Sequence, residues 1–396
     1  MKTPLLFLSS CCVLSSSLVL AGCGGSGSGT GPAASEDSQP PTEDAPAPVV
    51  RASELGSGDH SADSVVLTPI ASSTERLAMP RDLAFNPLRP DELWVVNMGD
   101  ESVVIVHDTS TDTRTTERRK DGDASHFMAK PAALAFGADE TTFGIPGTFA
   151  SCGESHNTRD GTMPGDDFMG PALWSSDPSI FAKRNPHGLG SHLDMLHNSP
   201  LCMGIAHESA NVYWTISGKS NAILKYDFKK DHGIGNDDHS DGECYEYARG
   251  AFKYVEGVPS HLAYRGADAM LFIADTGNAR VAKLDTKSGT KGTKLISKEP
   301  MAGYFRMDAA TLTDVVTADS GMLTAPSGLE LRNDFVYVSD NANGRISAFT
   351  LDGERVNWID TGLPPGSLGG MAFGPDDKLY FVDMLGNRVL RIDPKH

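Results

Sequence analysis

Histidines gather in one part of the chain, and the residue types around them suit a transition metal. Nine of the twelve histidines lie between His126 and His261. The densest stretch, residues 188–203, holds His192 and His197 together with methionine and cysteine. Imidazole, thioether and thiolate groups favour zinc or copper over calcium. We expect His192, His197 and His261 to be candidate ligands on one face. Because His-x4-His is no recognised metal signature, the alternative is that the histidine, methionine and cysteine side chains plug a loop into the channel of the fold.

A second candidate, for calcium, lies in an acidic stretch farther along the chain. Asp237, His239 and Asp241 stand two residues apart before a glycine, which partly imitates a calcium loop. The histidine is a poor calcium ligand, and the closing glutamate is missing at its expected distance. Calcium at Asp237 and Asp241 is one interpretation, and a solvated acidic loop is the other.

Three late stretches share a pattern that predicts the elements positioning these residues. Beginning at Asp275, Asp340 and Asp383, each reads Asp-x4-Arg followed by Val or Ile, and each follows an apolar, strand-like run. Short strands repeating every few tens of residues are typical of a β-propeller, because one small sheet cannot bury both faces alone. We expect the aspartates to accept hydrogen bonds from turn amides and so to serve the scaffold.

Working back from these repeats, the sequence predicts an all-β, six-bladed propeller. The last unit ends one strand short, and residues 65–67 could supply its outer strand and close the ring, removing two exposed edges. The six inner strands align in one register, at residues 82–85, 133–136, 204–207, 261–264, 328–331 and 370–373.

The first column of this alignment contains four small residues and two titratable ones, Asp82 and His261. Small residues are expected where inner strands crowd a central channel, and departures from a local rule often mark function. Arg81 adds a cation beside Asp82. These three are our candidate catalytic residues; the alternative is that Asp82 and His261 hydrogen-bond to neighbouring backbone.

From about residue 63 to its end, the chain resembles the NHL-repeat family of six-bladed propellers. Pro-Ser-Gly-Leu at 326–329 and the Asp-x4-Arg turns carry the resemblance, which weakens in the first three blades. The family includes binding modules and enzymes. Its amidating-lyase branch places a zinc ligand in Pro-His-Ser/Asp-Leu, whereas Pro259-Ser260-His261-Leu262 has the histidine one position late, so that activity is not carried over. The early Glu-Gly-Pro of propeller lactonases is absent.

The first residues resemble a bacterial lipoprotein signal. A short apolar run ends at Leu20-Ala21-Gly22-Cys23, where small residues precede a cysteine that becomes lipid-modified. We expect a signal peptide at 1–22, a lipid-anchored flexible linker at 23–62 and the propeller at 63–396. Glycine after Cys23 points to the outer membrane if the cell is Gram-negative. An ordinary cleaved secretion signal is the alternative.

Three cysteines remain after the signal and the lipidation site. Cys152 ends the second strand of blade two, and Cys202 begins the inner strand of blade three, so adjacent blades bring them together. In an oxidising compartment we expect a Cys152–Cys202 disulfide and a free Cys244 on the outermost strand of blade three. Metal ligation by the thiols, or two unpaired cysteines, are the alternatives.

The formal charge of −18 makes nucleic acid an unexpected ligand, since the longest basic run has three residues. Two functions stay open. The first is an envelope-tethered monomeric binding module whose top face takes a peptide, glycan or protein. The second is a metal-dependent lyase or hydrolase, with His261 and His192 or His197 holding the ion and Asp82 or Arg81 handling protons or substrate charge.

Overall fold

The computed structural model describes residues 51–156 and 167–395. The predicted signal peptide, Cys23 and most of the predicted linker lie outside these residues. Strands dominate, and the helices are single turns at η1 (Ser53–Leu55), η2 (Ala62–Ser64), η3 (Ser73–Glu75), α1 (Ala124–Phe127), η4 (Thr276–Asn278) and η5 (Ala318–Ser320).

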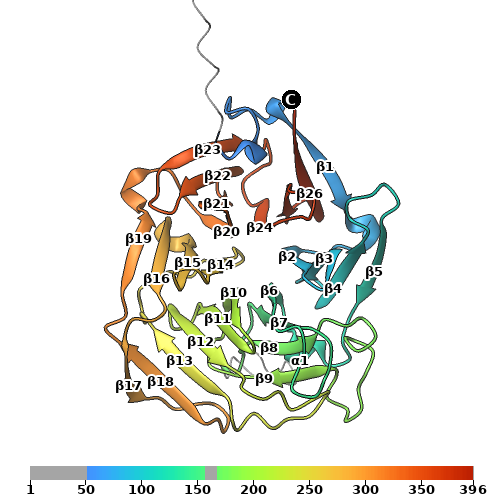
Figure 1. Cartoon of the computed structure of the whole chain (residues 1–396), viewed down its shortest axis with the longest axis vertical. Helices are drawn as coiled ribbons and strands as arrows, with labels where there is room; N and C mark the ends of the chain where they lie inside the picture. Colours follow the sequence, from blue (N-terminus) through green and yellow to red (C-terminus); the bar gives the residue numbers. More distant parts are fainter. Residues whose placement is uncertain (1–50, 157–166, 396) are drawn as a thin grey trace, which may run out of the picture. The chain divides into compact units, whose positions relative to one another are not determined.

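The strands form six sheets arranged as blades around a centre (Figure 1), which confirms the predicted six-bladed propeller. Blades one and two consist of β2 (Pro80–Asn86), β3 (Arg89–Asn97), β4 (Ser102–His107), β5 (Thr115–Arg119), and β6 (Pro131–Phe136), β7 (Thr148–Gly153), β8 (Ala172–Ser175), β9 (His192–Met195). Blades three and four contain β10 (Cys202–Ser209), β11 (Val212–Ser217), β12 (Ala222–Asp227), β13 (Glu243–Tyr247), and β14 (Leu262–Arg265), β15 (Met270–Asp275), β16 (Arg280–Asp285), β19 (Leu312–Val316). Blades five and six contain β20 (Pro326–Arg332), β21 (Phe335–Asp340), β22 (Arg345–Thr350), β23 (Arg355–Asp360), and β24 (Leu368–Phe373), β25 (Leu379–Asp383), β26 (Arg388–Pro394), β1 (Val65–Ala71).

The ring is closed by strands from both ends of the described chain. Strand β1 pairs antiparallel with β26, with Val65 opposite Pro394 and Ala71 opposite Val389. Figure 1 shows the blue β1 beside the red β26. The predicted N-terminal closing strand is confirmed, and it leaves blade six with four paired strands.

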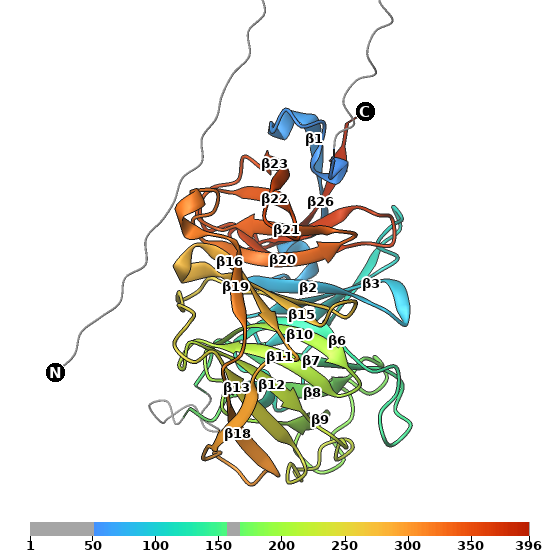
Figure 2. The same cartoon turned by 60° about the vertical axis from the view of Figure 1, so that its left-hand side comes forward.

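Blade three is wider than predicted because a hairpin from blade four extends it. Strands β17 (Thr290–Lys294) and β18 (Gly303–Asp308) lie between β16 and β19 in sequence, yet β18 pairs in parallel with β13 (Figure 2). We predicted that Cys244 lies on the outermost strand of blade three, and this is wrong. Its strand, β13, is followed in the sheet by β18 and β17. Cys244 is buried and free, as expected.

The packed body begins before residue 63, the boundary expected from the sequence. Leu55 is buried in a cluster with core residues of blades five and six. The Asn357 side chain of β23 donates to the Ala52 carbonyl at 3.0 Å, and the His60 ring stacks on Trp358 with centroids 4.4 Å apart. The end of the predicted linker thus packs on blade five.

The repeated aspartates hold turns, as predicted. Asp275 is buried, accepts from the Lys253 amide at 3.1 Å and pairs with Arg280 at 2.8 Å. Asp383 accepts from the Gly386 amide at 2.9 Å and pairs with Arg388 at 2.7 Å. Asp383 therefore accepts from its own turn, whereas Asp275 accepts from the segment that leads into β14, and each aspartate pairs with the arginine that follows its turn.

Small residues in the inner strands allow close approach around the channel. A Cβ at Gly204 would lie 2.1 Å from the Ser260 carbonyl oxygen, and one at Gly370 would lie 2.1 Å from Asp82 Oδ1. No side chain fits at such distances. The strand packing therefore explains the small column of the alignment.

Candidate functional site

A pocket of about 550 Å³ lies at the mouth of the central channel. It is formed where the chain leaves one blade and enters the next, together with hairpin turns on the same face. The polar side chains on its lining are those of Arg81, Lys130, Glu154, Ser155, His156, Tyr254 and Glu256. Of these, the sequence analysis singled out Arg81 alone.

Arg81 crosses the channel mouth. Its Nη1 donates to the Gly257 carbonyl at 2.8 Å, on the segment that enters blade four across the ring. The same guanidinium contacts the sulfur atoms of Met98 at 3.0 Å and Met384 at 2.9 Å. Its Nη2 has no hydrogen-bond partner in the described part of the chain, so this group can donate to a ligand in the pocket. Burial lowers the pKa of Arg81, and the charge of Glu154 acts in the opposite direction.

Glu154 lies on the pocket lining and binds the segment that contains Tyr254 and Gly257. One carboxylate oxygen accepts from the Tyr254 hydroxyl and from the Gly257 amide, both at 2.6 Å. This leaves Tyr254 with its ring on the pocket lining and fixes the segment to which Arg81 donates. A buried carboxylate that receives two donors orders the loop it binds.

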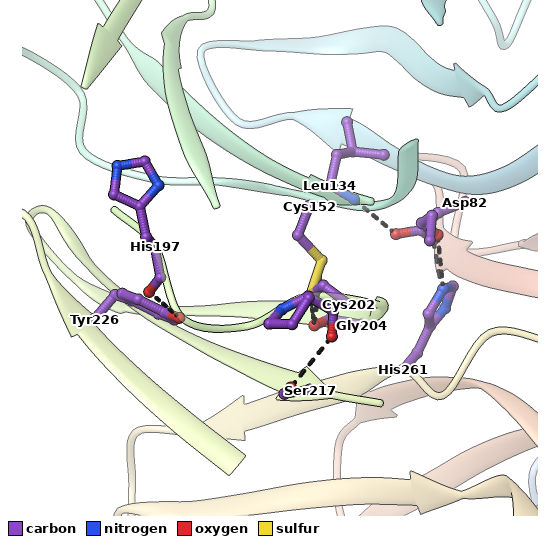
Figure 3. Close-up of a disulfide and its surroundings, with 11 residues drawn as sticks. Asp82, Leu134, Cys152, His197, Cys202, Gly204, Ser217, Tyr226 and His261 are labelled. Atoms are coloured by element: carbon purple, nitrogen blue, oxygen red, sulfur yellow. Dashed lines mark hydrogen bonds and ion pairs between the residues drawn. A yellow bond between two sulfur atoms is a disulfide. The ribbon is translucent and has the colours of Figure 1, made fainter. Parts of the chain in front are cut away.

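The predicted disulfide between Cys152 and Cys202 is confirmed, with a Cα–Cα distance of 5.6 Å (Figure 3). Glu154 follows Cys152 by two residues, and Leu201 precedes Cys202, and both line the pocket. The bridge therefore fixes the pocket wall where blades two and three meet.

Asp82 and His261, the two titratable residues of the inner column, contact each other. Asp82 Oδ1 lies 3.5 Å from His261 Nδ1. The carboxylate also accepts from the Leu83 amide at 2.8 Å and the Leu134 amide at 3.0 Å, as Figure 3 shows for Leu134. Burial raises the pKa of Asp82, and His261 partly offsets this. His261 Nε2 lies 3.5 Å from the Ala132 carbonyl oxygen. Both side chains of the pair are therefore largely occupied by contacts with the backbone.

Glu330 is a channel residue that our sequence analysis did not select. It lines a cavity of about 390 Å³ inside the channel, together with Asp82 and His261. Burial, and then the Asp82 charge, raise its pKa to about 8. A signal was available, since Glu330 occupies the third column of the inner-strand alignment, where the other five blades have alanine.

His192 and His197 do not lie with His261, so the expectation that the three histidines meet on one face is wrong. His192 begins β9, the outermost strand of blade two, where its ring stacks on Phe127 with centroids 3.6 Å apart. Its Nδ1 donates to the Leu189 carbonyl at 2.8 Å. His197 follows β9, and Figure 3 shows it on the other side of the disulfide from His261. Part of the histidine-rich stretch therefore forms the outer edge of blade two.

The calcium-like loop lies between β12 and β13, at the periphery of blade three. Asp241 Oδ2 accepts from the Lys230 amide at 3.3 Å. In the described residues, neither Asp237 nor Asp241 belongs to a group of three converging ligand atoms. His239 from this loop instead turns inward, 3.0 Å from Asp194 Oδ1.

Two overlapping groups near His239 bring potential metal ligands together. One contains Asp194, His232 and His239, and the other contains His197, His239 and Glu299. In each, the ligand atoms lie within 4.8 Å of one another. A metal could therefore be held at the outer seam of blades two and three, which partly supports the metal expectation.

Among the described residues, no helix is long and apolar enough to cross a membrane. Comparisons with protein-family models and with curated proteins find no match.

Several solved structures are similar to this chain. An auxiliary nutrient binding protein from Bacteroides ovatus is 12% identical, with 80% of this chain and 69% of that chain covered and a TM-score of 0.45. An inactive virginiamycin B lyase from Staphylococcus aureus with quinupristin is 13% identical, covering 83% and 88%, with a TM-score of 0.47. A luciferin-regenerating enzyme is 12% identical, covering 83% and 95%, with a TM-score of 0.47. These likenesses carry no inference about function, and the propeller assignment follows from the strand order itself.

Proposed function

We propose that this chain is a lipid-anchored protein of the bacterial cell envelope whose NHL-type propeller binds a carboxylate-bearing peptide or glycan at the channel mouth. Cys23 is the proposed lipidation site, and the linker after it tethers a monomeric propeller. For a Gram-negative cell, the outer membrane is the proposed location.

The observation that carries the proposal is the Arg81 guanidinium in the mouth pocket. Two of its groups are held by Gly257 and the methionine sulfurs, so the side chain is ordered before a ligand arrives. Its Nη2 stays available, and Lys130 provides a second cation on the lining. The two N–H groups of Nη2 can donate to a carboxylate as charge-assisted hydrogen bonds, and pre-ordering of the side chain reduces the entropy lost on binding.

The remaining lining suits a ligand with donors as well as acceptors. Glu256 can accept from an amine or hydroxyl group, and the Tyr254 ring offers an apolar face for a sugar or a side chain. Pockets of several hundred cubic ångströms with a few convergent polar groups are typical of small-ligand sites.

An oxidising compartment is supported by the disulfide next to the pocket, because such bonds persist outside the cytosol. The enzyme alternative has weaker support. The ligands it requires, His261 together with His192 or His197, lie in different parts of the propeller, and His261 is engaged by Asp82.

A binding panel tests the proposal. The full chain would be titrated with acidic and neutral hexapeptides, an oligogalacturonate and a neutral maltooligosaccharide. We expect a carboxylated probe to bind and Arg81→Gln to weaken it at least tenfold, with Arg184→Gln, an exposed arginine outside the pocket, as the matched control. Equal binding by both variants, or binding of neutral probes alone, would contradict the proposal.

A further inference from the structure

Three peripheral segments from different blades meet at one place, which we call the outer seam: residues 194–199, 228–242 and 295–302. The first contains the end of β9 of blade two and the residues after it, the second joins β12 to β13, and the third is the tip of the β17–β18 hairpin. The Asn198 side chain donates to Ser297 Oγ at 3.2 Å, and the Ala302 amide donates to the Gly242 carbonyl at 3.0 Å.

Each segment contributes one ligand atom to a compact group at the outer seam. His197 Nε2 lies 3.2 Å from Glu299 Oε2, and His239 Nε2 lies 4.0 Å from the same oxygen. At metal–ligand distances of about 2.05 Å, a tetrahedral site separates neighbouring ligand atoms by roughly 3.3 Å. Of the three distances between ligand atoms, the one from His197 to Glu299 already fits, and the one from His239 to Glu299 requires a contraction of under an ångström. The third, between the two imidazoles, falls within the 4.8 Å that spans the whole group.

The other ring nitrogen of each histidine has a partner that sets the tautomer. His197 Nδ1 donates to the Phe168 carbonyl at 2.8 Å, and His239 Nδ1 donates to Asp194 Oδ1 at 3.0 Å. The Met195 amide lies 3.4 Å from His239 Nδ1 but 2.7 Å from Asp194 Oδ1, so the carboxylate takes that proton. Both Nε2 lone pairs are therefore left for a ligand. Metal-bound histidines in proteins have the same arrangement.

The surroundings of the outer seam also favour an ion there. His197 is 3% exposed and His239 is 8% exposed, whereas the Glu299 side chain is 38% exposed and gives access from solvent. His232 Nε2 is buried without a hydrogen-bond partner in the described residues, but His232 belongs to the second group, with Asp194 and His239, and so marks the competing position for an ion. Two neutral imidazoles, one carboxylate and an open fourth position are a donor set that zinc accepts.

We propose that His197, His239 and Glu299 bind a zinc-class divalent cation, with Asp194 orienting His239. The ion ties the inserts of blades three and four to the outer edge of blade two. The proposal is independent of ligand binding at the channel mouth, since the outer seam lies at the periphery.

Zinc titration of the chelator-treated full chain, monitored by a competing chromophoric chelator, tests the proposal. We expect one zinc per chain and a thermal midpoint that rises with zinc and falls again with EDTA. His239→Gln and Glu299→Gln should each lower zinc affinity at least about tenfold, and Asp194→Asn about 10- to 100-fold. His187→Gln, which removes an exposed histidine elsewhere, is the matched control and should bind like the wild type.

The second group, which contains His232, supplies a discriminating variant. The proposal predicts that His232→Gln keeps full zinc affinity. A loss of zinc affinity in this variant would instead place the ion at Asp194, His232 and His239. Because Glu299 is partly exposed on a hairpin tip, Glu299→Gln should fold, which circular dichroism verifies. Zinc binding that survives both Glu299→Gln and His197→Gln, or no stoichiometric binding, would overturn the proposal.

Discussion

Removing the Cys152–Cys202 disulfide should measurably destabilise the propeller and disturb the mouth pocket. The bond links residues 50 apart in sequence. A loop of this length restricts the unfolded chain by an amount worth about 4 kcal/mol. For a body of about 350 residues, the entropy of unfolding is roughly 0.7 kcal/mol per kelvin. The double variant Cys152→Ser/Cys202→Ser should therefore unfold about 6 °C below the wild type.

Thermal melts followed by circular dichroism provide the assay, with reductant as a second route to the same state. Wild-type protein in reductant should melt with the double variant, while Cys244→Ala should keep the full sensitivity to reductant, since Cys244 is free. Because the bridge holds Glu154 and Leu201 on the pocket lining, probe binding should also weaken. A shift below about 1 °C, or a Cys202–Cys244 crosslink in non-reduced peptides, would refute this reasoning.

Three further predictions concern the channel, the closure and the anchor. With its folded-state pKa near 8, Glu330 keeps its proton while the unfolded chain has lost it, so its contribution to the free energy of unfolding is most favourable below about pH 4.5 and decreases as pH rises to 8. In urea titrations, the stability of Glu330→Gln relative to wild type should therefore increase across this range, and a pH-independent difference would contradict the raised pKa. Deleting residues 61–70 should abolish cooperative unfolding or greatly lower its thermal midpoint, because β26 loses its partner strand and the core loses the buried Val65 and Ile70. Deleting residues 24–48 should leave the midpoint unchanged, and equal midpoints for the two deletions would argue against closure by β1. Cys23→Ser should move the protein from carbonate-washed membranes to the soluble fraction, and retention in the pellet would reject lipidation.

The sequence predicted the blades because their signals are local and repeated. The turn aspartates lie five residues before their arginines, so one hairpin explains each of them. The disulfide was also predictable, since strand order alone places Cys152 and Cys202 at neighbouring strand ends. The closing strand followed from the missing outer strand of blade six.

The seam and the pocket were less accessible, because their residues come from inserts without a repeat. Four residues at His192–Met195 are too few to distinguish an outer strand from a loop, and our placement of His192 and His197 failed there. Glu299 lies about a hundred residues from His197 and reaches it only because the β17–β18 hairpin pairs with another blade. No pattern in the sequence predicts that this hairpin pairs with the neighbouring blade.

Hydrogen–deuterium exchange on the full chain, with and without the carboxylated probe that binds best, tests the central claim most directly. If the ligand lies at the channel mouth, the account predicts slower exchange in the segments around Met98, Lys130, Glu154 and Gly257, and none of this protection in Arg81→Gln. Protection confined to the outer seam or to the blade edges, with these four segments unchanged, would contradict the account.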